Sequence, residues 1–240
     1  MKLVRYADRP DLRARRFAEL SGVTFPEYMH HNQRGNRYWG RLYSGFPDFQ
    51  VALVEGDALL AEAHAVPVPW DETVDGLPSG WEDGFILGMT SDQPATALMA
   101  IAISVAPARQ GERLSRRMIE AFKDSARAAG LGSVIAPVRP TLKEHYPLIP
   151  IERYLDWRRT DGSHFDPWIR IHEHVGGEIL APAPESMTIS APKADWEEWT
   201  GMSFPDDGEY VFPGGLATLV VLDVIGTHVE PNVWMVHRVD

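Results

Sequence analysis

Residues 98–115 read LMAIAISVAPARQGERLS, and this stretch indicates the fold more clearly than any other part of the sequence. Its first eight residues, 98–105, are a near-continuous apolar run, which is typical of a strand buried on both faces. Large and small side chains alternate along this run. Strict alternation predicts one large face, formed by Met99, Ile101, Ile103 and Val105. The opposite, small face leaves room for a helix or an inserted ligand.

A helix and a second strand follow this first strand. Pro107 ends the strand, because proline cannot donate a hydrogen bond to a sheet. After the turn at 108–111, apolar residues at helical spacing predict a helix that continues to about Ala129. Residues 133–138 are expected to form the next strand. A strand, a helix and a strand in this order predict a parallel strand pair, because such crossovers are almost always right-handed.

The turn that leads into this helix has the features of an anion site. The first N–H groups of a helix have no partners within it, and the helix dipole adds about half a positive charge there. Four arginines, at 109, 113, 116 and 117, are opposed nearby only by Glu112. Phosphate is therefore the expected ligand, although neither the P-loop nor the G-x-G-x-x-G pattern occurs. The alternative is an amphipathic surface helix whose arginines are solvated.

Composition limits the class of protein. The chain has 240 residues, of which 44% are hydrophobic, and it has no cysteine, which excludes disulfides, thiolate nucleophiles and cysteine-ligated zinc. A net charge of −11 argues against a nucleic-acid partner. No apolar stretch reaches the about 20 residues of a membrane span, and the first 16 residues lack the apolar core of a signal peptide. We therefore expect a soluble, cytoplasmic protein with no membrane partner.

The rest of the chain gives weaker signals. Residues 69–95 resemble a loop, and residues 26–46 have no clean period. No linker separates two parts, so we expect a single domain over 1–240. The other expected elements are strands at 2–6, 49–54, 58–68, 187–190, 216–224 and 233–239, and helices from about 11 to 20, at 167–175 and at 195–200.

The segment Val105–Ser115 resembles motif A of the GCN5-related N-acetyltransferases (GNATs), which reads Q/R-x-x-G-x-G/A after a Val-x-Pro strand end. Gln110 takes the first position of this motif, and Arg113 replaces its middle glycine, which an arginine can do if its φ is helical. The resemblance implies an α/β (α+β) fold, with a mixed, mostly antiparallel twisted sheet, a central splayed strand pair and flanking helices. It covers most of the chain as one GNAT-like domain, with an insertion at 139–166.

The same resemblance implies a co-substrate, acetyl-CoA or another acyl-CoA. In this family the backbone amides of motif A hold the diphosphate of that molecule, and the pantetheine arm lies along the strand before it. The residues assigned to its binding in this way are Ile103, Val105, Arg109, Gln110, Gly111, Glu112, Arg113, Leu114 and Ser115.

The resemblance also suggests catalytic residues. His172, in the sequence IHEHVG, replaces a tyrosine that is commonly proposed to protonate the departing CoA thiolate, and packing or capping is the alternative role. Glu62 shares a strand face with His64, where this family often places the base that deprotonates the acceptor amine. A solvated strand face is the alternative for Glu62. Tyr38 and Trp39 are candidates for an acceptor pocket, and the alternative is ordinary core.

The predicted function is therefore acyl transfer from acyl-CoA to an amine, by direct attack within a ternary complex. The acceptor is a small molecule or a peptide, and the net negative charge of the chain favours a cationic amine. No metal site is expected, because His172 and His174 face apart on a helix. A homodimer is possible. Two alternatives stay open: a non-catalytic module that binds acyl-CoA, and a GNAT-like decarboxylase of acyl-CoA.

Overall fold

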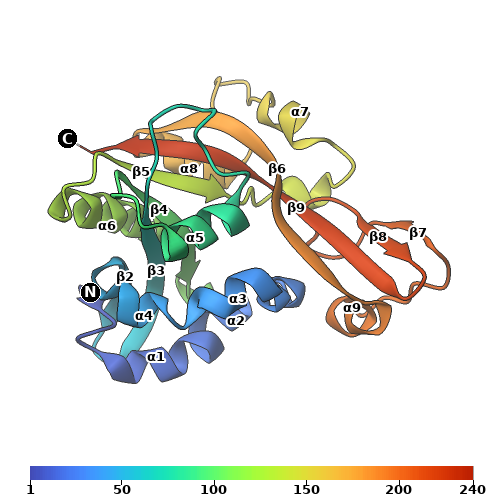
Figure 1. The fold of residues 1–240 in the computed structure, drawn as a ribbon, viewed down its shortest axis with the longest axis horizontal. Coiled ribbons are helices and arrows are strands. Elements are labelled where there is room, and N and C mark those ends of the chain that lie inside the picture. The colour runs from blue at the N-terminus through green and yellow to red at the C-terminus, as the bar shows by residue number, and fades with distance from the viewer. Residues whose placement is uncertain (240) are drawn as a thin grey trace.

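The structure is a computed structural model that describes residues 1–239, and within these residues one nine-stranded sheet organises the fold (Figure 1). The strand order is β1-β2-β3-β4-β5-β9-β8-β7, and β6 pairs along the other edge of β9. Among the strands of residues 1–239, only β4 and β5 pair in parallel. The strands are β1 (Lys2–Arg5), β2 (Gln50–Glu55), β3 (Ala58–Val68), β4 (Ala97–Val105), β5 (Ser133–Val138), β6 (Gly177–Pro192), β7 (Gly208–Tyr210), β8 (Leu219–Leu222) and β9 (Ile225–Arg238).

Helices cover both faces of the sheet. On one face lie α6 (Leu114–Ala128), α7 (Ile151–Leu155) and α8 (Pro167–His174), which pack on two adjoining hydrophobic clusters. The N-terminal helices and α5 (Trp81–Thr90) cover the other face. The remaining elements are α1 (Pro10–Arg16), the π-helix η1 (Phe17–Ser21), α2 (Gly22–Thr24), η2 (Glu27–His31), α3 (Gln33–Trp39), α4 (Leu42–Gly45), η3 (Pro47–Phe49), η4 (Pro107–Arg109), η5 (Lys143–His145) and α9 (Lys193–Thr200).

The parallel pair opens because β4 contains a bulge. The strands β4 and β5 pair only from Ala97 to Met99. Along the other edge of β4, Ala65 pairs with Ala100 while His64 pairs with Ala102, so that Ile101 is an extra residue. Such a bulge bends its strand and increases the local twist. The predicted parallel pair and the splayed centre of a mostly antiparallel sheet are therefore confirmed.

The bulge also makes the predicted alternation along β4 wrong. Leu98 packs on the α6 face before the bulge, and Ile103 and Val105 pack on that face after it. Met99 and Ile101 instead join the cluster on the opposite face. The extra residue shifts the two-residue period by one, and consequently no single face of β4 carries all the large side chains.

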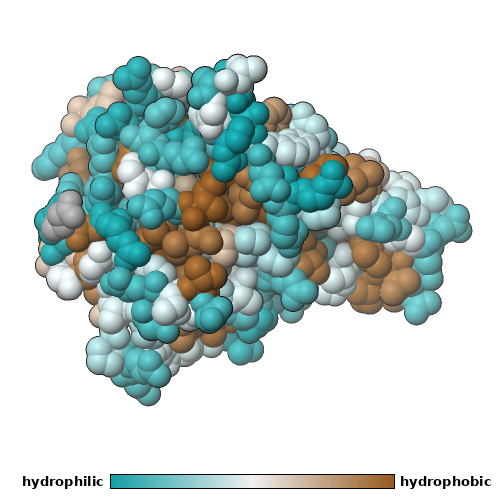
Figure 2. Space-filling view, turned by 90° about the horizontal axis from the view of Figure 1, so that it is seen from above, coloured by the Kyte–Doolittle hydropathy of each residue, from teal (hydrophilic) through white to brown (hydrophobic). Residues whose placement is uncertain are grey.

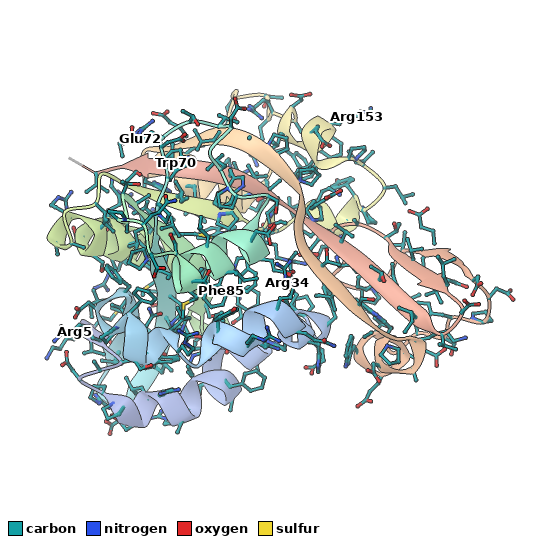
Figure 3. The ribbon with its side chains drawn as sticks, viewed as in Figure 1. Arg5, Arg34, Trp70, Glu72, Phe85 and Arg153 are labelled. Atoms are coloured by element: carbon teal, nitrogen blue, oxygen red, sulfur yellow. The ribbon has the colours of Figure 1, made fainter. Side chains whose placement is uncertain are left out.

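The helix α5 lies in a stretch that the sequence predicted to be a loop. Gly84 and Gly88 weaken its helical pattern, because glycine is a poor helix former. Both glycines allow close packing: a Cβ on Gly84 would lie 2.5 Å from the sulfur of Met99, and one on Gly88 would lie 2.7 Å from Val66. The buried ring of Phe85, labelled in Figure 3, packs against Trp39 and Trp81. Tertiary contacts thus stabilise this helix.

The strands β6 and β9 continue past the body of the sheet as a long arm (Figure 1). The elements β7, β8 and α9 complete this arm around the buried rings of Trp196, Phe204 and Phe212. Figure 2 shows hydrophobic surface on the arm, where Val220 and Leu222 are exposed. The predicted strands at 187–190 and 233–239 cover only parts of these two long strands, because prolines and polar residues interrupt their apolar pattern.

Residues 139–166 contain η5, α7 and several turns, and they pack on β5 and β9 through a shared cluster. Their status as an insertion stays a prediction. The predicted hairpin at β2 and β3, the long helix α6 and the C-terminal helices α8 and α9 are confirmed, with shifts of a few residues at their ends. Within residues 1–239, no helix combines the length and the apolar character needed to cross a bilayer.

Candidate active site

A cavity of about 480 Å³ lies where β4 and β5 separate. Residues 100–103 of β4 form one wall, and residues 136–139 at the end of β5 form another. The N-terminal helices close a further side, and α8 contributes Trp168 and His172. The bulge in β4 thus creates a space that opens at the middle of the sheet and receives side chains from both faces.

The turn after β4 leaves its backbone donors free. Gly111 has a φ of 86° and Arg113 a φ of 61°, both in the left-handed region. Within residues 1–239, the amide of Glu112 bonds to the Arg109 carbonyl at 3.4 Å, whereas the amides of Gly111 and 113–116 have no protein partner. The free N–H groups and the helix dipole make this end of α6 suited to a diphosphate.

Arg113 does not meet the condition of a right-handed helical φ under which an arginine readily replaces the middle glycine of the motif. It lies just before the first residue of α6, in the conformation that glycine adopts at least cost. A glycine at the middle position of motif A would take this conformation without strain. Arg113 takes it with an exposed side chain, which forms no ion pair within residues 1–239. This guanidinium is therefore available to a phosphate.

The other arginines near the turn are partly neutralised. Arg109 contacts Glu112 at 2.6 Å and Glu55 at 3.3 Å. Arg116 pairs with Glu120 at 3.0 Å. The local positive charge is therefore smaller than the sequence indicates, because two carboxylates outside the turn lie within reach of these side chains.

His172 is buried in the wall of the cavity. Its Nδ1 lies 2.9 Å from Nε2 of His237 on β9, and its Nε2 has no partner in residues 1–239. Burial holds the pKa of His172 well below its usual value, so that the ring is neutral at pH 7. If His237 donates to Nδ1, the single proton of His172 lies on Nε2 at the cavity wall.

Glu62 belongs to a buried polar cluster behind the cavity. It accepts hydrogen bonds from Nε and Nη2 of Arg16 at 2.8 Å each and from Tyr6 at 2.6 Å, and Nε2 of His64 is 3.1 Å away. Burial opposes ionisation of this carboxyl, but His64 and Arg16 outweigh it and lower the pKa of Glu62 to about 2. Glu62 is fully buried, so the alternative of a solvated strand face is wrong.

The other sequence candidates lie in three places. Ile103 and Trp39 line the cavity. Tyr38 packs at the edge of a hydrophobic cluster, and Val105 packs on the α6 face. The residues 109–115 lie beyond the cavity, at the end of β4 where the turn begins.

Sequence reasoning missed seven polar residues of the cavity wall: Arg16, Ser21, His30, Asn32, Asn36, Arg139 and Asn232. They lie on or beside short N-terminal helices, just after β5, or inside β9, where no local pattern marks them. The π-helix that presents Ser21 is a form often found at functional sites, but its sequence signature is weak. Only the fold brings these side chains together.

Comparisons with known proteins agree with this geometry. No family model matches the sequence. The chain is 27% identical over 270 residues to the arginine N-acetyltransferase avaD of Aspergillus versicolor, covering 97% of this chain and 92% of that protein. Among solved structures, the loading GNATL domain of CurA from Lyngbya majuscula has a TM-score of 0.62 at 17% identity and covers 99% of this chain and 96% of its own.

A GphF GNAT-like decarboxylase in complex with isobutyryl-CoA has a TM-score of 0.59 at 14% identity, with 99% of both chains covered. These solved structures share the fold of this chain. The open strand pair, the turn with free amides and the cavity between them define an α/β protein of the GNAT fold. The sequence of the chain is thus similar to that of an N-acetyltransferase, and its fold is that of the solved GNAT-like structures.

Two buried carboxylates predict an acid-sensitive fold. Glu230 on β9 has no exposed surface. Burial opposes its ionisation, but Arg139 and His228 outweigh burial and lower the pKa of Glu230 to about 2. The pKa of Glu62 is also about 2. Because the usual value is 4.5 in the unfolded chain, each group stabilises the fold above about pH 4.5. This contribution, about 3 kcal/mol per group, is lost as the pH falls from about 5 towards 2.

Urea unfolding between pH 7 and pH 3 measures this loss. The variant Glu230→Gln should have a shallower decline in the free energy of unfolding below pH 5 than the unaltered protein. The exposed Glu120→Gln serves as the matched control and should follow the unaltered protein. A free energy of unfolding that stays constant from pH 5 to pH 3 would contradict this assignment.

Proposed function

We propose that this protein transfers an acyl group from acyl-CoA to the amine of a small acceptor. The observation that carries the proposal is the opening between β4 and β5, with free amides at its outer end and a cavity of about 480 Å³ at its centre. The amides of Gly111 and residues 113–115 and the guanidinium of Arg113 hold the diphosphate. The thioester reaches the cavity past Ile103, along the unpaired edge of β4.

In this proposal, the acceptor nitrogen attacks the thioester carbonyl carbon while both substrates are bound. A C–N bond forms, the C–S bond breaks, and the nitrogen loses a proton. Nε2 of His172 gives its proton to the departing sulfur while Nδ1 takes one from Nε2 of His237, so that the ring stays neutral; His237 takes a replacement proton from water, and the proton lost by the nitrogen goes to water. Backbone N–H groups of the unpaired edge of β4 stabilise the charge on the carbonyl oxygen. Much of the rate comes from holding the two substrates together.

For Glu62, the contacts favour a positioning role over that of a base. Its two oxygens are occupied by Arg16 and Tyr6, and it does not line the cavity. A carboxylate whose pKa is held at about 2 is a weak base at neutral pH. We propose that it fixes Arg16, and that deprotonation of the acceptor uses water or a cavity histidine. A cytoplasmic location and a homodimer stay predictions.

Calorimetry combined with a thiol-release assay tests the function. The protein should bind acetyl-CoA and should release free CoA when an acceptor amine is added. Release of CO2 from malonyl-CoA without an acceptor would indicate the decarboxylase instead. Binding without thiol release over a broad panel of amines would favour a non-catalytic module. Absence of binding at millimolar acyl-CoA would contradict the co-substrate assignment.

The variant Gly111→Val tests the turn. A β-branched residue at this positive φ strains the backbone by about 1–2 kcal/mol and shifts the amides that face the diphosphate. We expect the Kd of acetyl-CoA to rise at least about tenfold, as measured by calorimetry. Gly201→Val, at another positive φ with open space in the arm, is the matched control and should leave this Kd unchanged. An unchanged Kd for Gly111→Val would remove the turn from the site.

A further inference from the structure

The charge of the cavity wall is opposite to that of the chain. The chain carries a net charge of −11, yet among the described residues 1–239 those that line the cavity include Arg16 and Arg139 and no Asp, Glu or Lys. The wall therefore offers cationic donors and no carboxylate to hold a cationic ligand. This distribution contradicts the simple inference from net charge, which favours a cationic acceptor.

Arg16 keeps one edge of its guanidinium free. Its Nε and Nη2 donate to the two oxygens of Glu62, both at 2.8 Å, which fixes the plane of the group. The hydrogen bonds of this side chain within residues 1–239 use Nε and Nη2 and not Nη1, and the side chain is 9% exposed and lines the cavity. An arginine held in this way can donate to a ligand at little cost in side-chain entropy.

Two further buried polar atoms near Arg16 lack partners. They are Oγ of Ser21, at the end of the π-helix, and Nε2 of His30, and both residues line the cavity. The ring of His30 packs on Phe17 at 5.1 Å, next to Arg16 in sequence. Unpartnered buried polar atoms are uncommon, because each one costs free energy unless a ligand or water satisfies it.

These groups suit an anion with two oxygens. We propose that Arg16, with Ser21 and His30, binds the carboxylate of the acceptor, so that the acceptor is an amino acid. This inference rests on the proposed acyl transfer and assigns its acceptor class. One carboxylate oxygen accepts from Nη1 of Arg16, and the other accepts from the hydroxyl of Ser21 or from Nε2–H of neutral His30. The amine of the same molecule then extends towards β4 and the thioester.

Pairs of acceptors that differ only in the carboxylate test this inference. Initial rates of CoA release from acetyl-CoA are compared for amino acids and their decarboxylated amines: arginine with agmatine, lysine with cadaverine, and tyrosine with tyramine. For the best pair, we expect kcat/KM to be at least about tenfold higher with the amino acid. An equal or higher kcat/KM for the amine would overturn the inference and leave acyl transfer intact.

Variants test whether the preference for a carboxylate depends on the cavity wall around Arg16. Ser21→Ala removes only an unpartnered hydroxyl, so the fold should tolerate it. It should raise KM for the amino acid about threefold or more and leave KM for the matching amine unchanged. Ser44→Ala, on the exposed side of α4, is the control. Equal KM shifts for both acceptors in Ser21→Ala would contradict the carboxylate contact.

One further experiment distinguishes a carboxylate on the acceptor from a carboxylate on the acyl group of the acyl-CoA. Malonyl-CoA is incubated without an acceptor, and acetyl-CoA formation is measured. Its formation, with loss on Arg16→Lys, would place the carboxylate on the acyl group and overturn the amino-acid assignment. If acetyl-CoA binds but no acceptor of any kind releases CoA, the proposed acyl transfer fails and this inference fails with it.

Discussion

Glu62→Ala is expected to lower the free energy of unfolding by about 3–5 kcal/mol, the usual cost of leaving a buried charge without its partner. The substitution removes the carboxylate that accepts hydrogen bonds from Nε and Nη2 of Arg16 and from the Tyr6 hydroxyl. Glu62 itself has no exposed surface. A loss of this size is a large fraction of the stability of a typical domain, which is about 5–15 kcal/mol.

Urea denaturation at pH 7 measures this effect. Glu55→Ala is the matched control, since Glu55 is half exposed and contacts Arg109 at 3.3 Å. Its loss should stay below about 1 kcal/mol, as is usual for a surface pair. A loss below 1 kcal/mol for Glu62→Ala would mean that the cluster contributes little to the fold.

The variant Glu62→Gln separates positioning from base catalysis. It keeps the shape of the side chain and weakens its hold on Arg16. If Glu62 acts by fixing Arg16, KM for the acceptor should rise while kcat changes little. A fall in kcat with an unchanged KM would instead support the base role that the sequence suggested.

His172→Phe is expected to lower kcat about 100-fold at pH 7 and to leave the Kd of acetyl-CoA unchanged. The reason is that Nε2 of His172 is an unpartnered polar atom of the cavity wall, and general acid catalysis commonly contributes 10²–10⁴-fold. Phenylalanine fills a similar volume beside Trp168, whose ring centre lies 4.4 Å from that of His172.

A pH profile gives this prediction a second readout. Because burial lowers the pKa of His172 below 6.5, the ring should stay neutral from pH 7 upwards. If transfer of the proton on its Nε2 limits the rate, kcat should not change with pH in this range. His174→Phe, on the exposed side of the same helix, should retain the kcat of the unaltered protein. Unchanged turnover for His172→Phe across pH 6–9 would exclude the acid role.

The sequence predicted those helices and strands whose own residues show clear hydrophobic periodicity or turn residues. Apolar patterns in residues 98–138 predicted β4, α6 and β5 to within about two residues. Residues 105–115 carry the resemblance to the GNATs. The hairpin of β2 and β3 followed from two β-type runs around Glu55-Gly56-Asp57. In these segments hydrophobic periodicity and turn chemistry agree, and both are read from neighbouring residues.

The tertiary structure decided where the polar side chains of the site lie. The bulge at Ile101 depends on pairing with β3, and the alternation of large and small residues in the sequence does not indicate it. This bulge reverses the faces of β4 and opens the strand pair. The cluster of Arg16 with Glu62 joins residues 46 positions apart, and the pair of His172 with His237 joins residues 65 apart. Sequence alone determined the elements with strong local signals, such as β4 and α6, but it missed α5, which tertiary contacts stabilise. Burial, charge pairing and the cavity depend on contacts between distant segments, which only the folded chain makes.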